Sequence, residues 1–149
     1  MLTDCRYDTN RVKSALSRID SPSWRAWSGY AFENLCLLHV QPIKKALGIS
    51  GVYAEVSSWQ SREHGAQIDL LIDRRDHIIS VCEIKFSKDP YVINKAYRGE
   101  LERKLTAFRL ETQTRKTVFL TLISTFGLQA NQHSIGFVQN VVTMNDLFG

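Results

Sequence analysis

The sequence contains no long apolar run and has little cysteine or histidine. No stretch approaches the about 18 apolar residues of a membrane-spanning helix, and no charged-then-apolar segment indicates a secretory signal. The three cysteines, Cys5, Cys36 and Cys82, lack CxxC spacing, and the last two have apolar neighbours. We therefore expect reduced thiols in the core and a cytoplasmic protein without a membrane span.

Several catalytic motifs are missing as well. Without a GxxxxGK[ST] sequence the chain has no P-loop and is not expected to hydrolyse ATP by itself. No GxSxG sequence and no spaced Cys–His pair supports nucleophilic catalysis, and the four histidines lack the spacing of metal ligands. The carboxylates are therefore the remaining candidates for catalytic residues.

The composition is that of one folded domain. Of the 149 residues, 44% are hydrophobic and 23% charged, which excludes an extended disordered chain. A chain of this length buries most of its apolar surface around one core, so we expect a single domain over residues 1–149. Residues 1–20 are its expected N-terminal helical extension. The net charge of +4 permits a polyanionic partner without establishing one.

Apolar periodicity predicts an α/β protein with a mixed central sheet flanked by helices. A helix begins at Ser21-Pro22, is kinked or broken at Pro42 and ends near Gly48. A second long helix follows Pro90 and ends near Thr112. The expected strands are residues 51–59, 67–73, 77–86, 117–123 and 137–143, with a last helical turn over 145–148.

Two of these apolar strands contain an acid. Asp69 lies in the second strand, and Glu83 lies in the third, two residues before Lys85. Because side chains alternate along a strand, Glu83 and Lys85 emerge on one face. An antiparallel hairpin brings Asp69 to a position beside or nearly opposite Glu83, in a register that the sequence leaves open.

A third acid lies on the first helix. Glu33 shares a helix face with Gly29, Cys36 and Val40, so it projects from a stripe that faces the sheet. Converging carboxylates repel each other, and burial raises their pKa values, unless a cation occupies the site. Oxygen ligands without histidine favour Mg²⁺ or Mn²⁺ over Zn²⁺. A lysine beside such a metal suits a reaction in which negative charge develops on phosphate or water.

These residues resemble the signature of the PD-(D/E)xK nuclease superfamily: a strand Asp, then (Asp or Glu)-x-Lys on the next strand, often with a helix Glu. Here the signature residues are Asp69, Glu83-Ile84-Lys85 and Glu33, with Ile68 in place of the signature proline. The resemblance implies a restriction-endonuclease-like αβββαβ core over about residues 22–123. The segments GYAFENLC, GAQIDLLIDR, CEIKFS and TLIST, with the final DLF, are also similar to the C-terminal domain of prokaryotic AAA-type ATPases.

The resemblance also implies roles for the residues. Asp69 and Glu83 hold Mg²⁺ or Mn²⁺, the carbonyl of Ile84 completes the inner shell, and Glu33 contributes directly or through water. Lys85 orients the attacking water and neutralises the charge that develops on the phosphate.

Other residues are expected around this centre. Gln67 lies on the face of Asp69 and is placed to hydrogen-bond the cluster. The superfamily often carries a polar or basic residue on the second long helix beside the active site, for which Lys104 is the candidate, as a contact for nucleic acid. Lys44, Lys45 and Lys88 extend a surface for the phosphates of nucleic acid, as do Arg115 and Lys116, and His64 lies in the loop before Asp69.

Two functions follow from these expectations. The first is a metal-dependent phosphodiesterase acting on DNA as an endonuclease, in an ATPase system or alone. The alternative is an inactive nucleic-acid-binding or regulatory domain that partners an AAA-type ATPase. The spacing of the basic residues also fits an ordinary solvated helix and surface.

Overall fold

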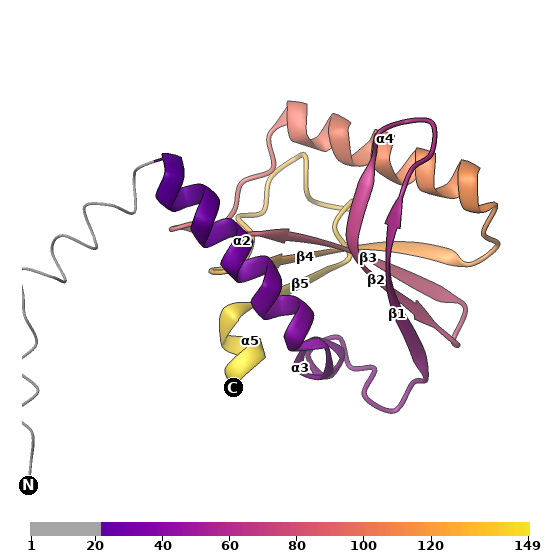
Figure 1. Cartoon of the computed structure of the whole chain (residues 1–149), viewed down its shortest axis with the longest axis horizontal. Helices are drawn as coiled ribbons and strands as arrows, with labels where there is room; N and C mark the ends of the chain where they lie inside the picture. Colours follow the sequence, from indigo (N-terminus) through magenta and orange to yellow (C-terminus); the bar gives the residue numbers. More distant parts are fainter. Residues whose placement is uncertain (1–21) are drawn as a thin grey trace, which may run out of the picture.

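A computed structural model describes residues 22–149 and shows an α/β protein with a five-stranded mixed sheet flanked by helices (Figure 1). The helical extension expected over residues 1–20, which includes Cys5, lies outside the described residues. The elements run in the order α2 (Pro22–Leu38), α3 (Val40–Ala46), β1 (Ala54–Gln60), β2 (Gln67–Arg74), β3 (Ile78–Lys85), α4 (Lys95–Thr112), β4 (Thr117–Ser124), β5 (Asn140–Thr143) and α5 (Met144–Phe148).

The strands lie in the sheet in the order in which they occur in the chain. β1, β2 and β3 form an antiparallel meander, whereas β4 is parallel to β3 and β5 is parallel to β4. Helix α4 makes the long connection that the parallel pair β3–β4 requires. The expected fold class and element order are therefore confirmed at the level of an α/β fold with a mixed sheet.

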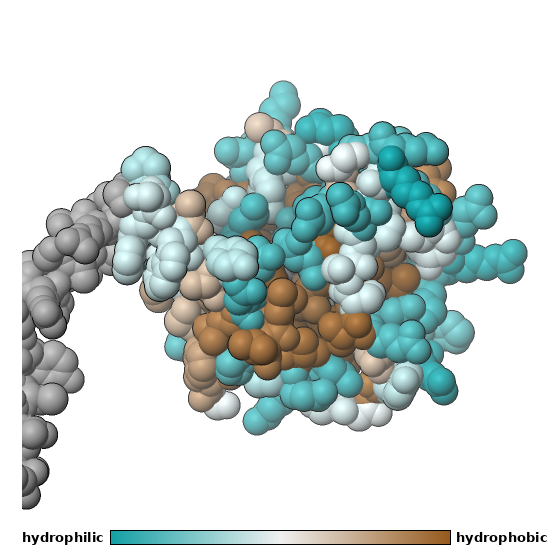
Figure 2. All heavy atoms as spheres, viewed as in Figure 1, coloured by the Kyte–Doolittle hydropathy of each residue, from teal (hydrophilic) through white to brown (hydrophobic). Residues whose placement is uncertain are grey.

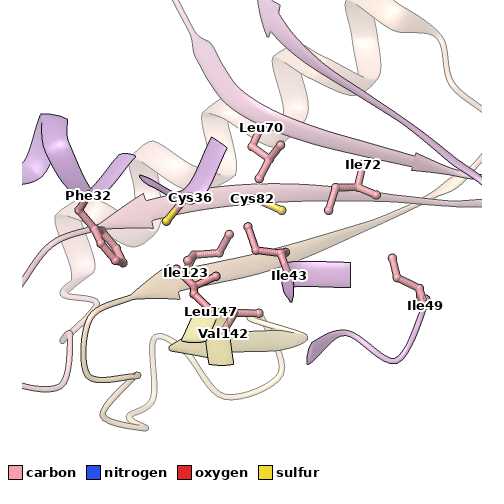
Figure 3. Close-up of a cluster of buried hydrophobic side chains, with 10 residues drawn as sticks. All are labelled: Phe32, Cys36, Ile43, Ile49, Leu70, Ile72, Cys82, Ile123, Val142 and Leu147. Carbon is pink, nitrogen blue, oxygen red and sulfur yellow. The ribbon is translucent and has the colours of Figure 1, made fainter. Parts of the chain in front are cut away.

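Each face of the sheet has its own apolar core. Leu101, Leu105 and Phe108 of α4 pack with Val81 of β3 on one face. On the other face α2, α3 and α5 enclose a second cluster, which Figure 3 shows between these helices and the sheet; it consists of Phe32, Cys36, Ile43, Ile49, Leu70, Ile72, Cys82, Ile123, Val142 and Leu147. The sheet thus forms the middle of three layers.

The two cysteines of the described residues are free and buried, as expected from their apolar neighbours. Burial, reinforced by the charge of Glu33, raises the pKa of the Cys36 thiol to about 12. Burial also raises the pKa of Cys82 well above its usual range, with a smaller contribution from Glu83. Both thiols are consequently protonated at neutral pH and serve as core residues.

The first long helix does not continue to Pro42. It ends at Leu38, and α3 starts at Val40 with His39 as its N-cap residue. The ring of Pro42 clashes with the backbone carbonyl of the residue four positions earlier, which is Leu38. The helix therefore breaks one turn before the proline itself. Inside α3 the same proline lies in the first turn, where no intrahelical N–H bond is required.

The last strand is shorter than expected. Residues 132–137 form turns, and β5 begins only at Asn140. The Phe137 ring instead lies 3.8 Å from the guanidinium carbon of Arg98 on α4 and packs against the core beneath that helix. The first apolar residues of 137–143 therefore pack beneath α4, and only the later residues pair as a strand.

The surface that carries α2, α3 and α5 has an apolar area framed by polar side chains (Figure 2). Trp27, Tyr30 and Leu38 of α2 and Phe148 of α5 are among the exposed large hydrophobic residues. Within residues 22–149 no helix is both long and apolar enough to cross a membrane.

Candidate functional site

Glu83 and Lys85 lie at the end of β3 on the face covered by α4. Because side chains alternate along a strand, Glu83 lies on the same face of β3 as Val81, and Cys82 lies on the other face. The Val81 side chain packs in the cluster beneath α4. Lys85 is on this face too, because its ammonium lies 4.9 Å from the centre of the Tyr97 ring of α4. The expectation that the two signature residues share a face is therefore confirmed.

Asp69 occupies an irregular part of β2. Ser57 of β1 pairs with Leu71 of β2, but Trp59 of β1 pairs with Ile68 of β2. Three steps along β2 therefore match two steps along β1. The extra residue falls in the Asp69–Leu70 stretch. It explains why Ile68 packs beneath α4 while Leu70, two residues later, packs beneath α2. Bulges of this kind re-aim side chains and occur often beside active sites.

The register of β2 and β3 brings the two strand acids together at one end of the hairpin. The pairing extends to Leu70 opposite Cys82, and Asp69 and Glu83 are the next residues on the two strands. The Gln67 amide donates a hydrogen bond to Oδ1 of Asp69 at 2.6 Å, as its place beside Asp69 suggested. The sequence left this register open, and the structure defines it as far as the pair Leu70–Cys82.

Glu33 of α2 lies within electrostatic range of the same strand end. Burial is the main cause that raises the pKa of the Glu33 carboxyl, and the negative charge of Asp69 raises it further. The positive charge of Lys85 acts in the opposite direction. Glu33, Asp69 and Lys85 thus form one electrostatic group, although they come from a helix and two different strands.

The carboxylate of Glu83 is buried, with 6% of the residue exposed, and both of its oxygens have partners. Nζ of Lys104 lies 2.7 Å from Oε1, in an ion pair that connects β3 to the middle of α4. The Tyr97 hydroxyl donates to Oε2 at 3.1 Å. A buried carboxylate requires such partners, and Lys104 and Tyr97 supply them.

Tyr97 is the site residue that the sequence interpretation missed. The sequence assigned it no role in the site, yet its hydroxyl contacts Glu83 and its ring lies beside Lys85. Burial, with a further contribution from the Glu83 charge, raises the pKa of the Tyr97 phenol far above its usual range. A sequence signal was present: Tyr97 and Lys104 are seven residues apart, on one face of a helix whose core-facing tyrosine needs a polar partner.

The other basic residues expected at a phosphate-binding surface differ in exposure and in their partners. Lys44 is buried at 8% exposure, contrary to its expected place on a phosphate-binding surface, since α3 packs this face inward. Lys45 and Lys88 are exposed. Nζ of Lys116 is held by Asp73 and by the carbonyl of Arg74, at the other end of β2 from Asp69.

An open cleft of about 580 Å³ lies beside the Glu83–Lys104 pair, between α4 and the loop before β2. His64, Arg103 and Lys104 are among the residues that line it. The loop is attached to the end of α4 through Glu111, which accepts a hydrogen bond from the Arg62 N–H at 2.8 Å. His64 Nδ1 lies 3.6 Å from the other oxygen of the Glu111 carboxylate.

The donor chemistry of this strand end fits Mg²⁺ or Mn²⁺ better than a softer metal. The side chains at this end are carboxylates. Burial is the main cause of the raised pKa of Glu33, and the additional rise caused by the Asp69 charge is a repulsion that a cation relieves. The arrangement is not a preformed metal cluster. Among residues 22–149 no three His, Cys, Asp or Glu side chains form a group that is able to hold a metal ion, and Glu83 pairs instead with Lys104.

No family model, no curated protein and no solved structure matches this chain. The resemblance to the PD-(D/E)xK superfamily therefore depends on the signature residues and element order described above. The structure shows the coarser α/β fold, and the restriction-endonuclease-like core remains a prediction.

Proposed function

We propose that the chain is a metal-dependent phosphodiesterase that cleaves DNA at the strand end formed by Asp69, Glu83 and Lys85. The observation that supports this most is the register of β2 and β3. Leu70 pairs with Cys82, and Asp69 and Glu83 are the next residues on the two strands. Lys85 follows on the face of Glu83, and Glu33 reaches the same end from α2. Two adjacent strands and a helix thus contribute acids and a lysine to one end of the sheet.

In this proposal each residue has a defined task. Asp69, Glu83, the carbonyl of Ile84 and Glu33 hold the divalent cation, which supplies a Lewis acid for phosphate and water when bound. Lys85 orients the attacking water and balances the charge that develops on the phosphate in the transition state. Gln67 fixes the orientation of the Asp69 carboxylate through its hydrogen bond. Lys45 and Lys88, which are exposed, contact the DNA backbone.

The direct test is a cleavage assay with the full chain. Single-stranded, duplex and branched DNA are incubated with the protein in Mg²⁺, in Mn²⁺ and in a chelator. We expect cleavage of at least one substrate that requires the metal. Asp69→Asn, purified in the same way, controls for a contaminating nuclease, and equal cleavage by both proteins contradicts the proposal.

A second candidate is a non-catalytic nucleic-acid-binding or regulatory domain that partners an AAA-type ATPase. One observation favours it: both oxygens of Glu83 already have protein partners, and the described residues contain no three-ligand metal group. Such a domain binds nucleic acid equally well with and without metal. Nucleic-acid binding that is independent of Mg²⁺ and Mn²⁺, with no cleavage of any substrate, selects this alternative.

A further inference from the structure

The Glu83–Lys104 ion pair occupies the carboxylate that the proposed cation needs. The Glu83 side chain is 8% exposed and that of Lys104 is 24% exposed, so the pair is largely shielded from solvent. One oxygen binds the Lys104 ammonium and the other accepts the Tyr97 hydroxyl. The protein therefore supplies its own cation at this position.

Lys104 also belongs to a second environment. Its side chain lines the open cleft of about 580 Å³ between α4 and the loop before β2, together with His64 and Arg103. A lysine has a flexible four-carbon stem and three rotatable donors, so its ammonium is able to exchange between partners at low cost. From one backbone position Lys104 has access to a buried carboxylate on one side and to open solvent on the other.

We infer that Lys104 is an exchangeable counter-ion: a divalent cation displaces its ammonium from Glu83, and the released ammonium turns into the cleft as a contact for a phosphate group of the nucleic acid. The inference rests on the proposed function and deepens it. A metal ion bonds a carboxylate oxygen at about 2.0–2.1 Å, and an ammonium 2.7 Å from the same oxygen is then close enough to repel it strongly. The two cations compete for one carboxylate.

This exchange links the metal to the substrate. Without metal, the Lys104 charge is neutralised by Glu83 and attracts phosphate weakly. With metal, the Lys104 charge is no longer paired with Glu83, and the cleft, which Arg103, Glu100 and Glu102 also line, gains one positive charge. Metal and nucleic acid therefore bind with positive coupling, and thermodynamic linkage makes the coupling equal in both directions.

The first experiment measures Mn²⁺ affinity by calorimetry for the full-length parent, for Lys104→Gln and for Arg103→Gln. Removing the competitor is expected to tighten Mn²⁺ binding at least about fivefold in Lys104→Gln, at the lower end of typical coupling factors. Arg103→Gln is the matched control, since it removes one positive charge from the same cleft without touching Glu83. Lys104→Arg retains the competing charge and is expected to bind Mn²⁺ like the parent.

The outcomes separate the inference from the proposed function. Equal Mn²⁺ affinity in the parent and Lys104→Gln, with metal-dependent cleavage by the parent, overturns the inference alone. An equal gain in Lys104→Gln and Arg103→Gln also overturns it, because general electrostatics then explains the effect. Absence of Mn²⁺ binding in the parent and in Lys104→Gln overturns both the inference and the metal-dependent function.

A second measurement needs no variant, and so stands even if Lys104→Gln fails to fold. In protein labelled with ¹⁵N-lysine, the Lys104 Nζ resonance reports its partner. Titration with Mg²⁺ is expected to shift that resonance and to accelerate exchange of its protons with water, as the hydrogen bond to Glu83 is lost. A Lys104 resonance that stays unchanged while Mg²⁺ saturates the protein overturns the inference.

Discussion

The side chain of Tyr97 contacts both signature residues of β3 at once. Its hydroxyl donates a hydrogen bond to Oε2 of Glu83 at 3.1 Å, and its ring lies 4.9 Å from the Lys85 ammonium. Glu83 and Lys85 are two residues apart on one strand face, so a single aromatic residue from α4 spans the interval between them. Because the Tyr97 side chain is rigid, it fixes the orientation of the carboxylate and the position of the ammonium together.

Replacing Tyr97 with phenylalanine is expected to destabilise the protein by about 1–3 kcal/mol, because one oxygen of a buried carboxylate loses its hydrogen-bond donor. The ring and its contact with Lys85 remain. Chemical denaturation of the full chain measures the loss. Tyr91→Phe is the matched control, since the Tyr91 ring packs 5.7 Å from that of Tyr97 and the substitution again removes only a hydroxyl. Equal stabilities of Tyr97→Phe and the parent contradict a structural role for this hydrogen bond.

Glu33 is expected to make stability depend on pH. Burial and the charge of Asp69 raise its pKa in the folded state above that of the unfolded chain. Between those two pKa values the folded state binds more protons, so the free energy of unfolding falls as pH rises through this window. The glutamine side chain in Glu33→Gln cannot ionise, so the free energy of unfolding of this variant does not fall for this reason as pH rises. The melting temperature of Glu33→Gln relative to the parent should therefore increase with pH across the window and then level off; a difference that is constant with pH contradicts the assignment.

A divalent cation is expected to stabilise the fold. A ligand that binds only the native state adds about 2.7 kcal/mol to the free energy of unfolding at a hundredfold excess over its dissociation constant. Thermal melts in increasing Mg²⁺ or Mn²⁺ measure this gain. The gain should disappear in the double variant Asp69→Asn/Glu83→Gln, which lacks both strand carboxylates. A rise of the same size in that double variant means that the metal binds elsewhere.

The fold follows from patterns that are local in the sequence. Period-two alternation located β2 within one residue at its end, and the apolar stripe with Leu101, Leu105 and Phe108 located α4. The helix break expected at Pro42 lies one turn earlier, because the proline ring clashes with the carbonyl of Leu38. Phe137 was assigned to a strand because an apolar residue packed on a helix resembles one packed in a sheet.

The site was less predictable, because it depends on distances between elements. The pair Glu83 and Lys85 follows from strand alternation alone, and it was predicted. The extra residue in the Asp69–Leu70 stretch arises from the pairing of β2 with β1, which no sequence periodicity records. The partners of Glu83 on α4 lie 14 and 21 residues away along the chain, so only the packing of α4 on the sheet reveals them.

Asp69→Asn is expected to abolish cleavage without harming the fold. The amide oxygen of asparagine still accepts the hydrogen bond from Gln67, while the charge that repels Glu33 is gone. Thermal stability in metal-free buffer should be unchanged or higher, and the pKa of Glu33, followed by NMR titration, should fall. Unfolding of Asp69→Asn at room temperature shows instead that Asp69 is a structural residue, and it contradicts the catalytic assignment.

Lys85→Ala is expected to separate catalysis from binding. If the Lys85 ammonium acts on charge that develops only in the transition state, its loss lowers the rate of the chemical step and hardly changes ground-state affinity. Comparable electrostatic groups contribute about 2.7–4 kcal/mol, so the single-turnover rate should fall by at least about two orders of magnitude while DNA affinity stays within about a few fold. Lys45→Ala is the matched control on the exposed face of α3; it should weaken DNA binding in a salt-dependent manner and leave the single-turnover rate unchanged. If Lys85→Ala cleaves saturating DNA at the parent rate, the lysine has no part in the chemistry, and the non-catalytic alternative then explains the site better.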